Sequence, residues 1–181
     1  MPEGRDALPF HLSRRIELNP PPHGGSCQAE LAAEITHGAV SLSFNLVLDV
    51  DSVAEARHAL AIYLFDVGRS LIAGAEDARA IHQITFGEID GRSFGRCEVQ
   101  FRLADHREIT VPIEFEGGNT LTDAQDNLVK RIVALGEAVV ESLEHDAAEA
   151  HSYFDQHGDE LRSLTHNTRW LTHAYCEGAL P

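Results

Sequence analysis

The chain has 181 residues, 43% hydrophobic and 24% charged, a composition typical of a globular protein rather than a disordered or fibrous one. Its net charge of −15, from 29 acidic and 14 basic residues, argues against nucleic-acid binding, because phosphate contacts require a basic surface. The longest apolar run, residues 59–65, is far shorter than the roughly 20 residues that cross a bilayer, and three cysteines without paired spacing favour a reducing compartment. We therefore expect a small acidic cytoplasmic protein that binds neither nucleic acid nor membrane.

The first part of the chain predicts three strands. Apolar and polar residues alternate over residues 10–18, and they alternate again over 27–48 on either side of a tight His37-Gly38 turn. The segment 19–25 contains three consecutive prolines and cannot form a helix or a central strand, because proline lacks an N–H group. We expect one strand, a stiff turn and then a β-hairpin with one apolar face.

The middle of the chain repeats this scheme. An Asp-Gly pair at 90–91 is a strong turn signal, which predicts that a strand from about residue 84 turns there into the next one. Alternation over 97–103 and 109–115 predicts two further strands. Because Pro112 cannot donate a backbone hydrogen bond, we expect the last strand to lie at the edge of its sheet.

Two predicted helices share the same start and the same pattern. Ser52 and Glu55 open the first helix as a capping box, in which the hydroxyl and the carboxylate satisfy free backbone N–H groups. Thr120 and Asp123 open the second helix in the same way. Apolar and glycine positions then recur at a constant spacing, which gives the pairs Leu60 and Leu128, Leu64 and Ile132, Val67 and Leu135, and Gly68 and Gly136. The sequence therefore contains an internal repeat.

The repeat predicts the architecture of the whole chain. We expect an α+β fold of duplicated βββα units with antiparallel strands and long amphipathic helices on one face. The units are expected over about residues 10–75 and 82–154, followed by an extra C-terminal helix over about 159–176. A single domain is expected to contain all of residues 1–181.

The two helices carry expectations about packing. Glycine inside a helix costs roughly 1 kcal/mol relative to alanine, so Gly68 and Gly136 indicate close contact between the helices, with chance as the alternative. The second helix is expected from Leu121 to about Phe154, which is roughly 50 Å at about 1.5 Å per residue. A helix of this length must bend or continue against another subunit, and we therefore expect a homodimer.

The second helix also carries an acidic face opposite its apolar stripe. At about 100° per residue, one narrow sector contains Glu137, Glu141, Glu144, His151 and Asp155. Three interpretations stay open: a solvated face, a docking surface for a basic protein partner, or a divalent-metal site. The metal site would use His145, His151 and Asp155, because histidines and acids four residues apart lie on one side of a helix.

The predicted C-terminal helix carries a second candidate surface. One of its faces is apolar, and a separate face carries His166, Trp170 and His173. A tryptophan between two histidines can anchor a protein interface or stack on a flat ligand. The alternative is that this helix is buried on both sides, for example at a dimer contact.

The remaining residues give no sign of catalysis. Cys27 and Cys97 fall on apolar strand faces and are expected to be buried, inert thiols. Cys176 lies near His173, but no orienting residue for a Cys–His nucleophile is visible in the sequence. The sequence contains no motif for nucleotide binding, zinc-dependent proteolysis or serine hydrolysis.

These features favour a non-catalytic protein-binding or assembly module that needs no cofactor and binds a basic protein partner. The first alternative is an enzyme or small-ligand binder that uses a cleft between the two repeats and a divalent metal. The second alternative is an inhibitor or immunity-type protein that blocks a basic partner by its acidity.

Overall fold

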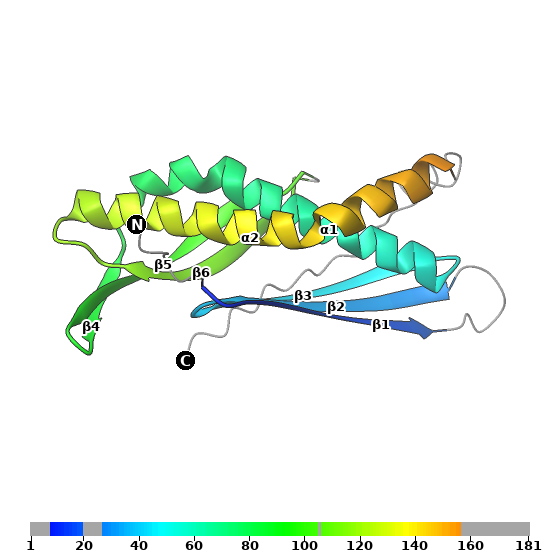
Figure 1. Cartoon of the computed structure of the whole chain (residues 1–181), viewed down its shortest axis with the longest axis horizontal. Coiled ribbons are helices and arrows are strands. Elements are labelled where there is room, and N and C mark those ends of the chain that lie inside the picture. Colours follow the sequence, from blue (N-terminus) through cyan, green and yellow to red (C-terminus); the bar gives the residue numbers. More distant parts are fainter. Residues whose placement is uncertain (1–7, 20–26, 105, 157–181) are drawn as a thin grey trace, which may run out of the picture.

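The computed structural model describes residues 8–19, 27–104 and 106–156. Two successive βββα units make up this part of the chain, which confirms the predicted duplicated α+β fold (Figure 1). The elements are β1 (Phe10–Asn19), β2 (Cys27–His37), β3 (Val40–Val50), α1 (Val53–Gly74), η1 (Ala75–Ala80, a 3-10 helix), β4 (Thr85–Ile89), β5 (Arg92–Arg102), β6 (Glu108–Glu116) and α2 (Leu121–Gln156). No helix within the described ranges is long and apolar enough to cross a bilayer.

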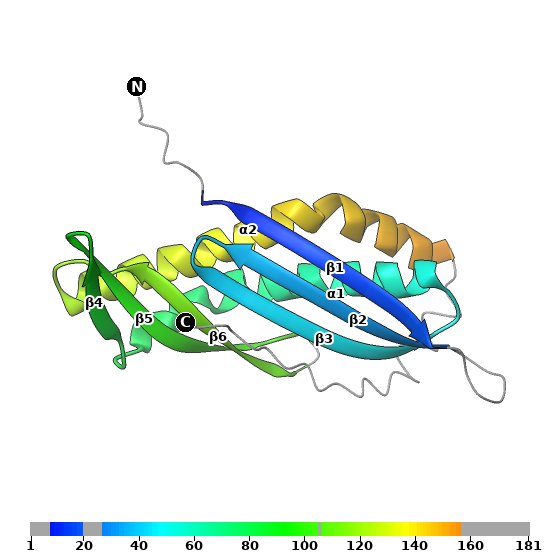
Figure 2. The same ribbon diagram turned by 90° about the horizontal axis from the view of Figure 1, so that it is seen from below.

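The described strands form two antiparallel sheets, in the orders β1-β2-β3 and β4-β5-β6. Both helices cover the same face of these sheets, and β3 and β6 are the edge strands where the two sheets approach each other (Figure 2). Apolar residues on the inner face of each sheet pack against the helices and form the core. Pro112 lies on β6 and pairs with Glu98 of β5, so its predicted place in an edge strand is confirmed.

The hydroxyls of Ser52 and Thr120 cap the two helix starts as predicted, while the carboxylate of Glu55 accepts from the N–H of Asp51 over 2.6 Å, one residue before the N-cap. The N–H of Glu55 donates to Oγ of Ser52 over 3.1 Å, and the N–H of Asp123 donates to Oγ1 of Thr120 over 3.1 Å. Asp123 completes the second box, because its carboxylate accepts from the N–H of Thr120 over 3.1 Å. The boxes fix the entry of the chain into α1 and α2, and therefore the rotation of each helix.

The helices run antiparallel (Figure 1). They pack closely at the paired glycines. A Cβ atom at Gly136 would lie 2.9 Å from the carbonyl oxygen of Gly68 and 2.7 Å from Cγ1 of Ile72. A Cβ atom at Gly68 would lie 2.9 Å from Cγ1 of Val139. The predicted close approach of α1 and α2 at these positions is confirmed.

The apolar stripe of α2 is buried along the whole helix, and its last turns pack within the same chain. Phe154 is buried, and the ring of Tyr153 lies 4.5 Å from the ring of His58 on α1. The helix is therefore long enough to pack along both units. Its length does not by itself require a second subunit.

Arg131 of α2 contacts the turn of the first hairpin. Its Nη1 lies 2.6 Å from Nδ1 of His37, and its Nη2 donates to the carbonyl oxygen of the same residue. His37 is only 5% exposed, and this burial, together with the charge of Arg131, lowers the pKa of its imidazole. Burial also lowers the pKa of Arg131, while the charge of Glu114 acts in the opposite direction. We infer that His37 is neutral at pH 7 and accepts at Nδ1.

Candidate functional site

The structure places the predicted acidic face of α2 in solvent. The buried stripe of the helix, from Ala124 to Phe154, packs toward α1 and the sheets and turns the opposite side outward. Every predicted residue of that side is exposed: Glu137, Glu141, Glu144, His151 and Asp155. We use the term acidic face for Glu137, Glu141 and Glu144.

The acidic face differs in its partners from several other acids of α2. Asp126 pairs with Arg79 of η1, and Asp146 pairs with Arg14 of β1 over 2.8 Å. Among the described residues, the side chains of the three glutamates of the acidic face have no ion pair or hydrogen bond. No basic side chain in this part of the chain therefore pairs with them.

The alternative metal site is not assembled by the helix. His145 pairs with Glu149 over 3.2 Å, while His151 and Asp155 lie on the exposed side. Within residues 8–19, 27–104 and 106–156, no group of three or more histidines, cysteines or acids is arranged to hold a metal ion. The predicted C-terminal helix over about 159–176, with His166, Trp170, His173 and Cys176, lies outside the described residues.

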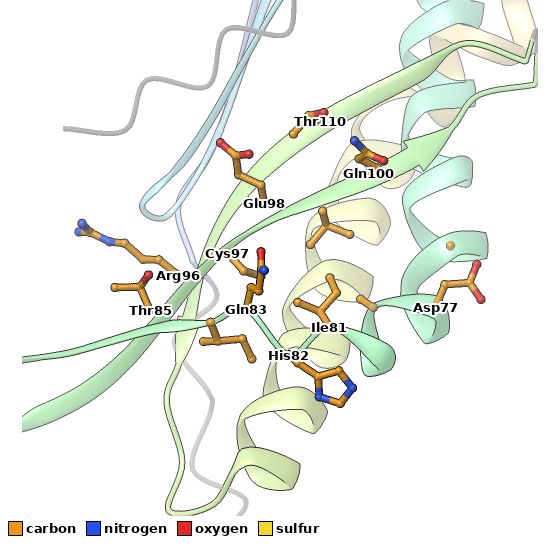
Figure 3. A pocket seen from close by; sticks show the side chains of 14 residues that line it. Asp77, Ile81, His82, Gln83, Thr85, Arg96, Cys97, Glu98, Gln100 and Thr110 are labelled. Atoms are coloured by element: carbon orange, nitrogen blue, oxygen red, sulfur yellow. The ribbon is translucent and has the colours of Figure 1, made fainter.

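A hollow of about 1020 Å³ lies beside β5 and was not predicted from the sequence (Figure 3). Its wall comes from the end of α1, from η1, from the connection at residues 81–84 and from β5 and β6. Polar side chains from η1, from the connection and from the two strands border it: Asp77, His82, Gln83, Arg96, Glu98, Gln100 and Thr110. The small-ligand alternative expected a cleft between the two repeats, whereas this hollow borders the connection and the second sheet.

Cys97 lies in the wall of this hollow. Its side chain is half-buried, as is that of Cys27, so the expectation of full burial is wrong for both residues. Burial still raises the pKa of the Cys97 thiol to about 11. The thiol therefore stays protonated near pH 7 and is a poor nucleophile, which agrees with the expected inert role.

Known proteins offer no guide to these two features. No protein-family model matches the chain, and no match is found among curated proteins or among solved structures.

Proposed function

We propose that this chain is a non-catalytic protein-binding module that docks a basic partner on the acidic face of α2. The observation that carries the proposal is that Glu137, Glu141 and Glu144 have no ion-pair partner among the described residues, whereas other acids of the same helix pair with arginines. The three glutamates are four and three residues apart, so their side chains project from one side of α2. The other side of α2 packs against α1 and the sheets along the helix. Such a surface matches cations spaced along one side of a partner helix.

The electrostatic contribution of the acidic face is moderate per residue and cumulative over the surface. An exposed ion pair contributes roughly 0.2–1 kcal/mol, because water and salt screen it. Several like charges on one face also steer a basic partner toward it, and the net charge of −15 strengthens this effect. We therefore propose a fast, salt-sensitive interaction rather than a permanent complex.

We further propose that the protein acts as a homodimer in the cytoplasm. The support for self-association is that β4 exposes an apolar side chain on each of its two faces, Phe86 at 53% and Ile89 at 54% exposed. Light scattering on a size-exclusion column tests it directly at tens of micromolar protein. The mass of a dimer is expected, and the mass of a monomer would refute this part of the proposal.

The docking proposal predicts that removing charge from the acidic face weakens binding of a basic helix. The probe is a labelled helical peptide with an arginine at every fourth position, and fluorescence anisotropy measures its affinity. The double variant Glu141→Gln/Glu144→Gln is expected to lose about fivefold in affinity, since each exposed pair contributes roughly 0.5 kcal/mol.

A matched variant separates docking from general charge attraction. Glu34→Gln/Asp49→Asn removes the same charge from exposed positions on β2 and β3. This control is expected to keep the affinity of the native chain within experimental error. An equal loss in both double variants, or no loss in either, would remove the acidic face as the docking surface.

A further inference from the structure

One edge of β5 is uncovered by the described residues where the second sheet borders the hollow. β6 pairs with β5 as far as Arg102, whereas β4 pairs with it only from Arg92 to Arg96. On the β4 side, the stretch of β5 from Cys97 to Arg102 has no strand partner in residues 8–19, 27–104 and 106–156. The hollow of about 1020 Å³ lies along this stretch.

Hydrogen bonds at both ends of the β5–β6 pair show which backbone groups point to the open side. The N–H of Gly117 donates to the carbonyl of Ser93 over 3.1 Å, and the N–H of Leu103 donates to the carbonyl of Arg107 over 2.7 Å. In an antiparallel pair, backbone groups alternate between the two sides of a strand. The odd-numbered residues of β5 therefore bond to β6, and the even-numbered ones, Glu98, Gln100 and Arg102, present their N–H and C=O groups to the open side.

The first unit shows what fills the equivalent position. There β1 runs antiparallel along β2 and pairs with it from Gln28 to His37. In the second unit, the residues preceding β4 form η1 instead of a longer strand. Arg79 pairs with Asp126 of α2, and Nε2 of Gln125 donates to the carbonyl of Ile81 over 2.7 Å. These contacts hold residues 75–84 away from β5, so that within the described part of the chain no strand takes the place that β1 has in the first unit.

The side chains around the open edge define the chemistry of an occupant. On the inner side, the small residues Gly74, Ala78 and Cys97 leave room for apolar side chains such as leucine or isoleucine. On the outer side, Glu98 and Gln100 lie along β5 (Figure 3), and Glu98 has no ion pair among the described residues. Neighbouring strands of a sheet share its two faces, so an added strand would alternate in the same way.

We infer that the open edge of β5 binds an extended segment of a partner protein as an added antiparallel strand that continues the line of β4. The segment has apolar residues alternating with polar ones, and a basic residue opposite Glu98. An uncovered strand edge is a template for such pairing, and main-chain hydrogen bonds would supply the affinity. This site is separate from the acidic face of α2, and either site can fail without the other.

The sequence of β1 supplies a probe for the edge, because β1 covers the equivalent edge and alternates as required. A fluorescein-labelled synthetic peptide of residues 10–19, FHLSRRIELN, is added to the full chain, and anisotropy measures its affinity. Gln100→Pro removes one N–H on the open side and leaves the pairing with β6, as Pro112 already does on β6. The expected loss in affinity is about tenfold, the effect of one hydrogen bond. Gln100→Ala keeps the N–H and is expected to bind like the native chain.

Two further measurements make the test independent of how well the proline variant folds. Glu98→Lys places a cation opposite the basic residue of the peptide and is expected to weaken binding severalfold. Hydrogen exchange of the native chain is expected to be fast at the amides of Glu98, Gln100 and Arg102 and to slow when the peptide is added. The inference would be overturned if the peptide did not bind, or if the proline and lysine variants bound it as tightly as the native chain does. Protection of these amides before peptide is added would also overturn it, because another part of the chain or a second copy would then fill the edge.

Discussion

Replacing Gly136 by alanine is expected to lower the free energy of unfolding by about 2 kcal/mol. The new methyl group would meet the carbonyl oxygen of Gly68 at 2.9 Å and the backbone nitrogen of Ile72 at 3.2 Å. Backbone atoms of a packed helix cannot turn aside, so α1 and α2 must separate. Overpacking of this kind costs up to about 3 kcal/mol, which exceeds the roughly 1 kcal/mol that alanine gains over glycine in a helix.

Urea unfolding followed by circular dichroism measures this loss, and Gly68→Ala provides a graded comparison. Its new methyl group would meet only side-chain carbons, at 2.9 Å from Val139 and 3.0 Å from Val140. Side chains adjust more readily than backbone, so a smaller loss is expected for Gly68→Ala. A Gly136→Ala protein more stable than the native chain would show that the helices do not meet at this point.

Replacing Arg131 by methionine is expected to cost about 2 kcal/mol of stability, the value of hydrogen bonds from a charged donor to buried acceptors. The variant leaves the carbonyl oxygen and Nδ1 of His37 without the guanidinium that contacts both. Arg79→Met is the matched control, because Arg79 pairs with Glu76 and Asp126 at the surface. A smaller loss is expected there, because solvent screens an exposed ion pair. Equal losses in the two variants would contradict a special role for the Arg131–His37 contact.

The same pair gives the stability a defined pH dependence. The folded chain holds the pKa of His37 below its ordinary value of about 6.5, through burial first and Arg131 second. The unfolded chain therefore takes up the proton more readily, and the contribution of His37 is complete above about pH 6.5 and lost as the pH falls toward the folded pKa. Denaturant titrations between pH 7 and pH 5 are expected to show a smaller loss for Arg131→Met than for the native chain.

Local sequence signals predicted the parts of the fold that depend on neighbouring residues. The capping boxes at Ser52 and Thr120 mark helix starts because their hydrogen bonds span only three residues. Pro112 predicts an edge strand because proline has no N–H group to donate to a neighbouring strand, whatever the rest of the fold. Gly68 and Gly136 were recognisable because both break the helix-forming pattern at equivalent places in the repeat.

The features that the sequence did not predict depend on contacts between distant residues. His37 and Arg131 meet only because the first hairpin lies against α2, and no local pattern indicates that meeting. The open edge of β5 arises because β4 begins only at Thr85, and contacts of η1 and of the connection with α2 hold the chain that precedes it. Apolar and polar residues do not alternate over residues 81–84, and this is the one sequence signal that β4 does not begin earlier.

The sequence predicts the acidic face itself, but not that its three glutamates have no ion pair among the described residues. Helical periodicity placed Glu137, Glu141 and Glu144 on one side of α2, and the structure exposes all three. Whether an acid pairs with an arginine depends on the fold, since Arg14, which pairs with Asp146, lies on a strand at the other end of the chain. The structure thus distinguishes acids of α2 that pair with arginines from acids that have no ion pair among the described residues.

Mapping the contact surface by NMR tests the docking of a basic partner on α2 most directly. The arginine-bearing helical peptide is titrated into the isotopically labelled chain, and amide chemical shifts are followed at physiological salt. The largest changes are expected at and around Glu137, Glu141 and Glu144, and they are expected to diminish in the Glu141→Gln/Glu144→Gln variant. Chemical-shift changes centred on the outer faces of the sheets, or spread evenly over all exposed acids, would contradict docking on the acidic face.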